Sequence, residues 1–519
     1  MKIVRSLKKE KPFYIVLAIF LFCILCEVIF ILFLNSSRLI YTVDDSYIHL
    51  ALAENIYIGH YGINTGEYSS PSSSILWPFL LAPFSRTGFG YLIPLIINFF
   101  SAAASILILW LFIKAALLQN LPDNKKEIGF LLLLILIPAL NLIGLIFTGM
   151  EHSIQVFLTI LIIYGLISFI YKEKHPSWLY AAIVIAPLIR YENLSVSFAS
   201  LLFLFLTGKK KNALISFSAI IILLTVFSLF LLNLGLEALP ISILEKGQVR
   251  LSGGIFNSIV GNFKHNILSE PRCIILFACT GFLILILADA KRKKEERFLA
   301  GCMSAAVLMH TAAGKSDRYI IYLWSASILI FLFLYREQLI KLILRNSFLK
   351  IASYISFILV ILCYTYIKLI IITPLASNNI YEQQYQIHRF VKEYYRKPVA
   401  VNDLGYASYQ NDSYVLDLAG LGSMEVHKEK RGGISYDWMN RIMSHHKVEL
   451  AIIYKSWFPN LPPKWNKAAE LYLGKKKYST ADSVVTFYAV NKESADKVRF
   501  LLNKFGRSLP AGVRLKEFN

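Results

Sequence analysis

The feature that most constrains this chain is a series of long apolar segments separated by short polar or basic stretches. Most of them contain about 18 or more apolar residues, the length that a helix needs to cross a bilayer. The chain is 56% hydrophobic, whereas a soluble globular protein is about 45–50% apolar. The sequence therefore predicts a polytopic α-helical membrane protein with about eleven transmembrane helices. The segments are 13–34, 91–118, 128–148, 152–171, 177–190, 193–206, 212–235, 272–289, 297–313, 318–335 and 349–373.

Positively charged residues occupy alternate connections between these segments. When the spans are counted as above, these connections all fall on one side of the membrane, which the positive-inside rule identifies as the cytoplasm. We therefore predict a cytoplasmic N-terminus and a multi-pass protein of the plasma membrane, here a bacterial inner membrane. The net charge of +21 therefore reflects these orienting basic stretches and does not indicate a nucleic-acid partner. The basic stretches are Arg5–Lys11, Lys125–Lys126, Lys172–Lys174, Lys209–Lys211, Lys291–Arg297 and Arg336–Arg345.

Two of the apolar segments, 177–190 and 193–206, are short for upright spans. They are either two crossings or one long helix that breaks near Arg190. Two crossings keep the basic stretches before and after them on the same side, so the span count includes both. Short or broken helices at membrane depth are tolerated where they line a polar cavity.

The chain changes character after residue 373. The region 374–519 is polar and, at about 145 residues, long enough for one independent core. A predicted helix at 380–395 precedes four short β-like runs that alternate with helical stretches, which favours a small extracytoplasmic α/β domain. We therefore divide the chain into a transmembrane domain, 1–373, and an α/β domain, 374–519. The β-like runs are 398–401, 414–418, 449–454 and 484–490.

The predicted first outer loop, 35–90, carries helical signals of its own. Residues 45–58 place apolar side chains near helical spacing and are followed by Gly59 and Gly62, whereas residues 74–84 are short, apolar and aromatic. Because Trp side chains and amphipathic helices settle at the membrane surface, we predict that both segments are helices lying in the outer interface.

Two adjacent carboxylates, Asp44 and Asp45, stand just after the first apolar segment. Ionisable residues beside a membrane are costly to place and are usually functional. A carboxylate there can accept the proton of an attacking hydroxyl group. The alternative is that an Asp caps the helix that follows, and both roles are compatible because there are two residues.

Two further polar turns fall on the same predicted face. In Thr148–His152, Glu151 and His152 either bind substrate hydroxyls or a metal, or form a tight turn with a favourably placed Glu. Arg190 and Glu192 interrupt the apolar stretch at 177–206, either as a buried structural ion pair or as a cavity-lining Arg that meets a phosphate or a sugar.

Lys315 and Arg318 lie between two apolar segments on the predicted outer face, against the positive-inside bias. Gripping an anionic phosphate explains these cations, and an interfacial pair of snorkelling side chains is the alternative. Weaker candidates for the same role follow in the loop 236–271: Lys246, Arg250 and Lys264.

The order of several short motifs resembles the GT-C superfamily of membrane glycosyltransferases. Asp44–Ile48 and Gly66–Trp77 are similar to the acidic pair and the Tyr/Ser-Pro…Leu-Trp segment of bacterial members. The chain as a whole also resembles protein mannosyltransferases. Further motifs resemble relatives of the mycobacterial arabinofuranosyltransferases, although Tyr191 stands where those relatives have Pro. These motifs are Gly149–Glu151, Arg190–Glu192, Val401–Gly405 and Asp417–Leu421. The resemblance covers the first two hundred residues well and touches the α/β domain.

The resemblance implies transfer of a sugar from a polyprenyl-phosphate donor to an acceptor saccharide, lipid or protein at the outer face of the membrane. Asp44 or Asp45 is then the general base, and Lys315, Arg318 and Arg190 hold the donor phosphate. We expect no cofactor and no metal, although some superfamily members use a divalent ion. The side chains expected to contact substrate are Tyr47, His49, Glu151, His152, Glu192, Asp317 and Tyr319.

Two other functions fit a chain of this composition. A transporter or flippase of a lipid-linked saccharide predicts polar residues spread through the spans and two related halves. Here the polar residues gather on one face and no internal repeat is visible. A non-catalytic scaffold predicts that the region 374–519 is essential while the acidic pair is dispensable.

Overall fold

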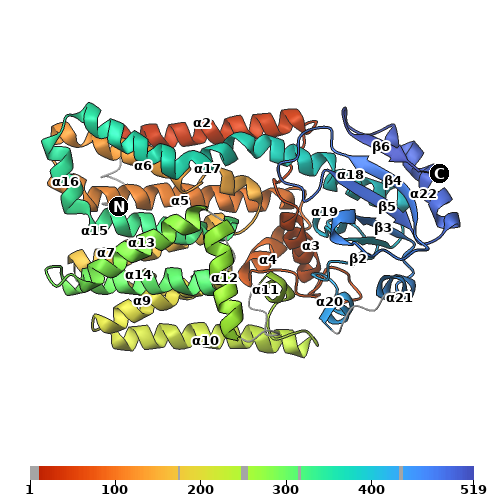
Figure 1. Cartoon of the computed structure of the whole chain (residues 1–519), viewed down its shortest axis with the longest axis horizontal. Helices are drawn as coiled ribbons and strands as arrows, with labels where there is room; N and C mark the ends of the chain where they lie inside the picture. Colours follow the sequence, from red (N-terminus) through yellow and green to blue (C-terminus); the bar gives the residue numbers. More distant parts are fainter. Residues whose placement is uncertain are drawn as a thin grey trace.

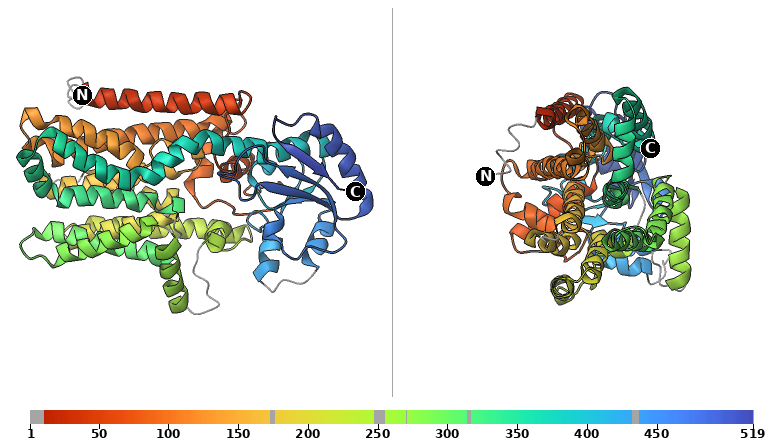
Figure 2. Two further views of the ribbon diagram at one scale, coloured as in Figure 1. Left: turned by 45° about the horizontal axis from the view of Figure 1, so that its top comes forward. Right: turned by 90° about the vertical axis from the view of Figure 1, so that its left-hand side faces the viewer.

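The computed structural model describes residues 11–172, 176–246, 255–269, 271–313, 317–431 and 437–518. It consists of a bundle of long helices with a mixed α/β domain beyond one end of the bundle (Figure 1). Two further views show the long helices running side by side with the sheet domain outside the bundle (Figure 2). The predicted division into a helical part and an α/β part is visible in this arrangement.

The helices of the bundle follow the apolar segments. Among the described residues, five helical stretches are long and apolar enough to cross a membrane, and four shorter apolar helices accompany them. The bundle helices are α2 (Lys11–Leu34), α5 (Ile93–Ala116), α6 (Glu127–Ala139), α7 (His152–Lys172), α8 (Ser177–Ile189), α9 (Leu194–Leu206), α10 (Lys210–Asn233), α13 (Pro271–Ala288), α14 (Lys294–Ala313), α15 (Ile321–Leu334), α16 (Arg336–Arg345) and α17 (Phe348–Glu382).

The short pair 177–190 and 193–206 forms two separate helices, α8 and α9, with the short 3-10 helix η6 (Tyr191–Asn193) between them. The backbone of Arg190 is extended, with φ −151° and ψ 132°, and this ends α8. The chain therefore breaks at Arg190, as either alternative requires. The segment 128–148 is helical as α6 only to Ala139, and a turn and the 3-10 helix η5 (Gly144–Thr148) complete it.

The basic connections between α9 and α10, between α13 and α14, and around α16 lie at the end of the bundle opposite the α/β domain (Figure 1). This is the segregation of charge that the sequence predicts. The side chains of α2 and α10 are mostly uncovered, with only 22% of each apolar window buried within the chain. Apolar faces of this extent, including the 79% exposed Phe33, are suited to contact with lipid.

The α/β domain is built on a six-stranded mixed sheet in the order β2-β1-β3-β5-β4-β6. β1 is parallel to β2 and β3, and the remaining pairs are antiparallel. Four strands match the predicted runs, whereas β4 and β6 were not predicted because both are polar and only partly buried. The strands are β1 (Val399–Val401), β2 (Val415–Asp417), β3 (Leu450–Ile453), β4 (Asn466–Tyr472), β5 (Val484–Ala489) and β6 (Arg514–Glu517).

One long helix joins the two parts of the molecule. α17 has 35 residues and runs past the predicted boundary at 373 as far as Glu382. It is followed by α18 (Gln384–Arg389) and the π-helix η9 (Phe390–Tyr395), so the predicted helix 380–395 is three consecutive helical pieces. The other helices of the domain are α19 (Gly405–Ser408), α20 (Met424–Arg431), α21 (Trp438–His445) and α22 (Lys492–Gly506).

The loop 35–90 fills the space between the bundle and the sheet (Figure 1). Its predicted helices are α3 (Asp45–Tyr57) and α4 (Leu76–Leu81), the latter followed by the 3-10 helix η1 (Ala82–Phe84). Their predicted position in the outer membrane interface stays a prediction. Residues 46–53 of α3 are buried without interruption, and Trp77 is 0% exposed, because the α/β domain and the bundle cover them.

Candidate functional site

Helix α3 places two sets of side chains on two faces. Residues three, four or seven apart share a face of an α-helix, so Asp44, Tyr47, Ala51 and Glu54 follow one stripe and Asp45 and His49 another. The first stripe meets α19, since Asp44 binds its backbone and the ring of Tyr47 stacks on that of Tyr406 with centroids 3.8 Å apart. The second stripe carries His49 toward the bundle. α3 therefore connects the two parts of the site.

Asp44 is bound to the α/β domain and not to its own helix. Its Oδ2 accepts a hydrogen bond from the backbone N–H of Gly405 at 2.7 Å, and its Oδ1 accepts one from Tyr406 at 2.8 Å. The residue occupies the N-cap position of α3 but makes no side-chain capping bond there. The alternative that Asp44 caps the following helix is thus wrong, because the carboxylate caps α19 instead.

Gly405 allows this close approach. A Cβ atom at residue 405 would lie 2.1 Å from the backbone oxygen of Asp44 and 2.5 Å from its Oδ2. We expect Gly405→Ala to push α19 away from Asp44 and to lower the free energy of unfolding by about 1–3 kcal/mol, the usual cost of overpacking. Thermal unfolding of the detergent-solubilised protein measures this. Gly66→Ala, where a Cβ meets nothing within 4 Å, is the matched control.

A third carboxylate, Asp403, lies beside the acidic pair. Its Oδ2 accepts hydrogen bonds from Gln384 at 2.8 Å and from Tyr454 at 3.4 Å. Burial and the charge of Asp403 raise the pKa of Asp44, against the two amide hydrogen bonds. Burial raises the pKa of Asp403 as well, with Asp45 adding repulsion. Asp44 and Asp403 therefore retain their protons to higher pH than isolated Asp residues would.

Asp417 and Asp403, which belong to two of the motifs named above, have different surroundings. The carboxylate of Asp417 forms a turn, because it accepts hydrogen bonds from the backbone N–H groups of Ala419, Leu421 and Gly422. Asp403 faces the acidic pair instead. The available signal was its position directly after a buried strand of the parallel part of the sheet, where functional side chains gather.

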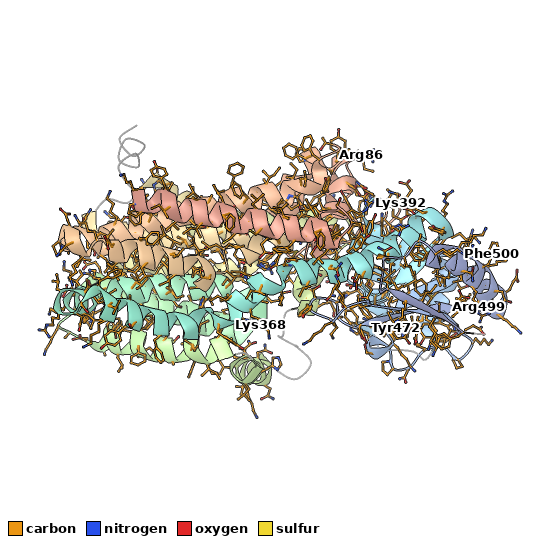
Figure 3. All side chains as sticks on the ribbon, turned by 90° about the horizontal axis from the view of Figure 1, so that it is seen from above. Arg86, Lys368, Lys392, Tyr472, Arg499 and Phe500 are labelled. Carbon is orange, nitrogen blue, oxygen red and sulfur yellow. The ribbon has the colours of Figure 1, made fainter. Side chains whose placement is uncertain are left out.

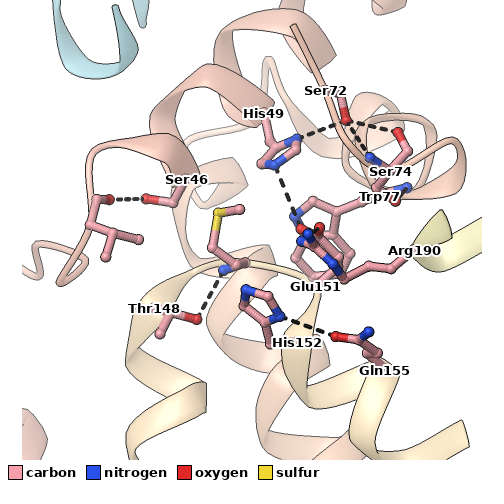
Figure 4. Close-up of polar contacts among 12 residues, drawn as sticks. Ser46, His49, Ser72, Ser74, Trp77, Thr148, Glu151, His152, Gln155 and Arg190 are labelled. Carbon is pink, nitrogen blue, oxygen red and sulfur yellow. Dashed lines mark hydrogen bonds and ion pairs between the residues drawn. The ribbon is translucent and has the colours of Figure 1, made fainter. Parts of the chain in front are cut away.

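The predicted residues around Glu151 and Arg190 meet in one buried ion network (Figure 4). Arg190 Nη1 donates to Glu151 Oε1. Its Nη2 and Nε donate to the two carboxylate oxygens of Glu192 at 2.9 Å and 3.2 Å. Arg190 is 1% exposed and Glu151 0%. Arg190 thus forms the buried ion pair considered above. Its predicted grip on a donor phosphate stays a prediction, because these contacts use three of its five N–H groups.

His49 extends this network to the loop 35–90. Its Nδ1 lies 3.1 Å from Ser72 Oγ, and its Nε2 lies 3.5 Å from Glu151 Oε2 (Figure 4). Gly149 permits the neighbouring approach, since it has a positive φ of 67° and a Cβ there would lie 2.7 Å from the ring of Tyr41. The predicted turn Thr148–His152 is thus a place where α3 contacts the bundle.

Tyr319, which belongs to the 3-10 helix η8 (Asp317–Ile320), joins the same region. The guanidinium of Arg190 lies over the ring of Tyr319, 5.1 Å from its centroid, and the ring of His152 packs edge-on against the same Tyr. Lys315 and Arg250 lie outside the described residues. The backbones of Asp317, Arg318 and Lys246 are helical, but their side chains are outside the description, so their predicted roles stay predictions. Lys264 is exposed on α12 (Ile255–Ser269), beside a small surface pocket.

Two cavities open on the face of α3 that meets the α/β domain. One, of about 220 Å³, is rich in tyrosine, with Tyr41, Tyr47, Tyr91, Tyr406 and Tyr409 in its wall. The other, of about 840 Å³, is lined mainly by polar residues of the loop 35–90 and of the α/β domain. Gln410 belongs to both walls. Arg86 and Lys392, which line the larger cavity, lie on the same side of the molecule in Figure 3.

No metal cluster forms at the acidic pair among the described residues. There, the group of His, Cys, Asp or Glu side chains spaced for a metal ion consists of Glu425, His445 and His446 in the α/β domain.

Comparison with known proteins finds matches to this chain. A family model described as a domain of unknown function, DUF8728, matches residues 378–488, which form most of the α/β domain. No curated protein matches the chain.

Among solved structures, the chain is similar to the oligosaccharyltransferase of Archaeoglobus fulgidus. The apo form is 12% identical with a TM-score of 0.41, over 92% of this chain and 77% of that one. The form tethered to an acceptor peptide is 11% identical with a TM-score of 0.41, over 96% and 75%. AglB in complex with an inhibitory peptide and a dolichol-phosphate is 13% identical with a TM-score of 0.41, over 91% and 74%.

Proposed function

We propose that the chain is a membrane glycosyltransferase that moves a sugar from a polyprenyl-phosphate donor to an acceptor at the outer membrane surface. The observation that carries the proposal is the position of Asp45, at the junction of a bundle of apolar helices and a soluble domain. It lies in a carboxylate cluster with Asp44 and Asp403. A lipid-linked donor reaches such a junction from the bilayer, and a polar acceptor reaches it from water.

Within this function, Asp45 is the general base and Asp44 is a positioning residue. Both oxygens of Asp44 are held by backbone N–H groups, and its side chain is buried, whereas Asp45 is partly exposed. In the transfer step an acceptor hydroxyl oxygen attacks the anomeric carbon of the donor. The bond from that carbon to the phosphate oxygen breaks, polyprenyl phosphate leaves, and Asp45 takes the hydroxyl proton.

The neighbouring cavities suit a carbohydrate acceptor. A wall of tyrosine rings offers the apolar faces of a saccharide a surface for packing. The larger cavity presents amides, hydroxyls and both signs of charge, with Asn64, Gln410 and Asn411 among its lining residues. Groups of this kind exchange hydrogen bonds with sugar hydroxyls. We propose that the acceptor enters between the loop 35–90 and the α/β domain.

The test is a transfer assay with the full chain in proteoliposomes. Polyprenyl-phosphate donors that carry different labelled hexoses or pentoses are offered with saccharide, lipid and peptide acceptors. We expect one pair to yield a labelled product and free polyprenyl phosphate. Movement of the labelled lipid between leaflets without a new glycosidic bond would contradict the proposal and would support a flippase.

The raised pKa of Glu54 makes the stability of the folded protein depend on pH. Burial raises its pKa from 4.5 to about 7, against the N–H of Gln410 and the charges of Lys392 and Arg86. Because the folded pKa is above the unfolded one, the folded state binds more protons in this window, and stability falls as pH rises from about 4.5 to about 7. We expect Glu54→Gln to remove this fall.

Thermal unfolding midpoints of the wild type and of Glu54→Gln at pH 5 and pH 8 measure the difference. Relative to the wild type, the unfolding midpoint of the variant should be higher at pH 8 than at pH 5. Glu493→Gln, at an exposed position on α22, is the control and should follow the wild type. An equal difference between Glu54→Gln and the wild type at both pH values would show that Glu54 does not titrate in this window.

A further inference from the structure

We propose that Glu425, His445 and His446 bind a divalent cation of the zinc type, and that this ion fastens α20 to α21 beside the larger cavity. The proposal concerns a cluster that the transfer chemistry does not use. It stands whether or not the chain is a glycosyltransferase. Glu425 lies in the first turn of α20, His445 is the last residue of α21, and His446 follows it.

The donor atoms of the three side chains already converge. Glu425 Oε2 lies 2.8 Å from His446 Nε2 and 3.4 Å from His445 Nδ1. All three donor atoms lie within 4.8 Å of one another. Zinc holds nitrogen and oxygen ligands at about 2.0–2.2 Å, so two ligands of a tetrahedral site are about 3.3–3.6 Å apart. Small rotations of exposed side chains are enough to reach this spacing.

The ligand types favour zinc over the hard cations. Two imidazole nitrogens and one carboxylate oxygen form a common protein set for Zn²⁺, whereas Ca²⁺ and Mg²⁺ prefer oxygen ligands throughout. The cluster faces water, since His445 is 69% exposed and Glu425 42%. A water molecule can therefore complete the fourth position.

A set of outer contacts fixes the orientation of His446. Its ring stacks on that of Tyr414 with centroids 4.7 Å apart and an interplanar angle of 7°. The hydroxyl of Tyr414 donates to Glu67 Oε2 at 2.8 Å, and Glu67 Oε1 accepts from the N–H of Met424 at 3.2 Å. Metal ligands are commonly held by such surrounding hydrogen bonds. Here the hydrogen bonds connect Tyr414 to Glu67 in the loop 35–90, and Glu67 to Met424, the residue before Glu425.

The position of Tyr414 indicates what the ion does. Tyr414 lines the larger cavity and touches His446, so an ion that immobilises His446 also immobilises this part of the cavity wall. The helices α20 and α21, which the ion pair of Glu429 with Arg441 already joins, gain a second bridge, and the α/β domain gains a firmer seat on the loop 35–90. The site is therefore structural, and its loss should loosen the domain.

The test uses the full chain in detergent, stripped with a chelator and then titrated with Zn²⁺ alone. We expect one ion per chain by calorimetry and elemental analysis, and a rise in the thermal unfolding midpoint. Co²⁺ in place of Zn²⁺ should give the absorption bands of a tetrahedral nitrogen- and oxygen-ligated site. The double variant His445→Ala, His446→Ala should lose both the binding and the rise.

His265→Ala, at an exposed histidine on α12, is the matched control and should bind Zn²⁺ like the wild type. A wild type that takes up no Zn²⁺ would overturn the proposal. Binding that persists in the double variant would overturn it as well, because the ion would then sit elsewhere. The wild-type titration alone decides the matter if the double variant fails to fold.

Discussion

Replacing Asp45 by asparagine is expected to abolish sugar transfer while the protein still folds. The amide keeps the size of the side chain but cannot accept the hydroxyl proton of the acceptor, and loss of a general base lowers rates by about 10²- to 10⁴-fold. The substitution also removes one of the carboxylates that repel Asp403, so the thermal unfolding midpoint should stay the same or rise. Transfer is measured with the lipid-linked donor that the wild type accepts.

Asp44→Asn provides the contrast. This variant exchanges a carboxylate that binds two backbone N–H groups for an amide that satisfies only one of them. We expect a lower unfolding midpoint and a partial loss of transfer. Asp496→Asn, on the exposed side of α22, is the control for the chemical change and should behave like the wild type. Wild-type rates in Asp45→Asn would remove Asp45 from the role of base.

Replacing Arg190 by methionine is expected to give the largest loss of stability. Methionine fills much of the same space but leaves Glu151 and Glu192 without their common cation. Removing one partner of a buried ion pair costs about 3–5 kcal/mol, because an uncompensated charge remains in a medium of low polarity. Unfolding in mixed detergent measures the change in free energy.

The double variant Arg190→Met, Glu151→Gln separates this cause from a loss of packing. If the uncompensated charge dominates, the double variant should be more stable than Arg190→Met alone, since the fully buried carboxylate is gone. Arg507→Met, at an exposed position after α22, controls for the loss of an Arg and should cost little. A double variant as unstable as the sum of both single changes would show that the network is not coupled.

The bundle was predictable because its signal is local. A run of apolar residues long enough to span a bilayer can satisfy its backbone only as a helix. The positions of α2, α5, α7 and α10 follow directly from such runs. Strands β4 and β6 were missed because apolar and polar residues alternate little along them and because they carry charges such as Lys467 and Arg514. β4 pairs with β5 and β6 pairs with β4, and this pairing, not their own composition, makes them strands.

The environment of the site could not be predicted in the same way. The sequence selects Asp44, Asp45, Glu151, Arg190 and Glu192 because charged residues beside apolar segments are costly. The partners of Asp44 are far away along the chain, since 361 residues separate it from Gly405. A spacing rule reaches only as far as one helix or one strand, so it cannot identify a partner in another domain.

The sequence by itself determined that this chain forms a bundle of apolar helices with its basic connections at one end, followed by a small α/β domain. It also determined that a few ionisable residues lie at the other end, because the free energy of transfer into an apolar medium is a property of each segment. Only the tertiary structure decided which of those residues are held by other groups and which stay accessible. Docking of the α/β domain on α3 uses both oxygens of Asp44, leaves Asp45 partly exposed and brings Asp403 beside them. That division depends on long-range packing, which no local pattern of residues contains.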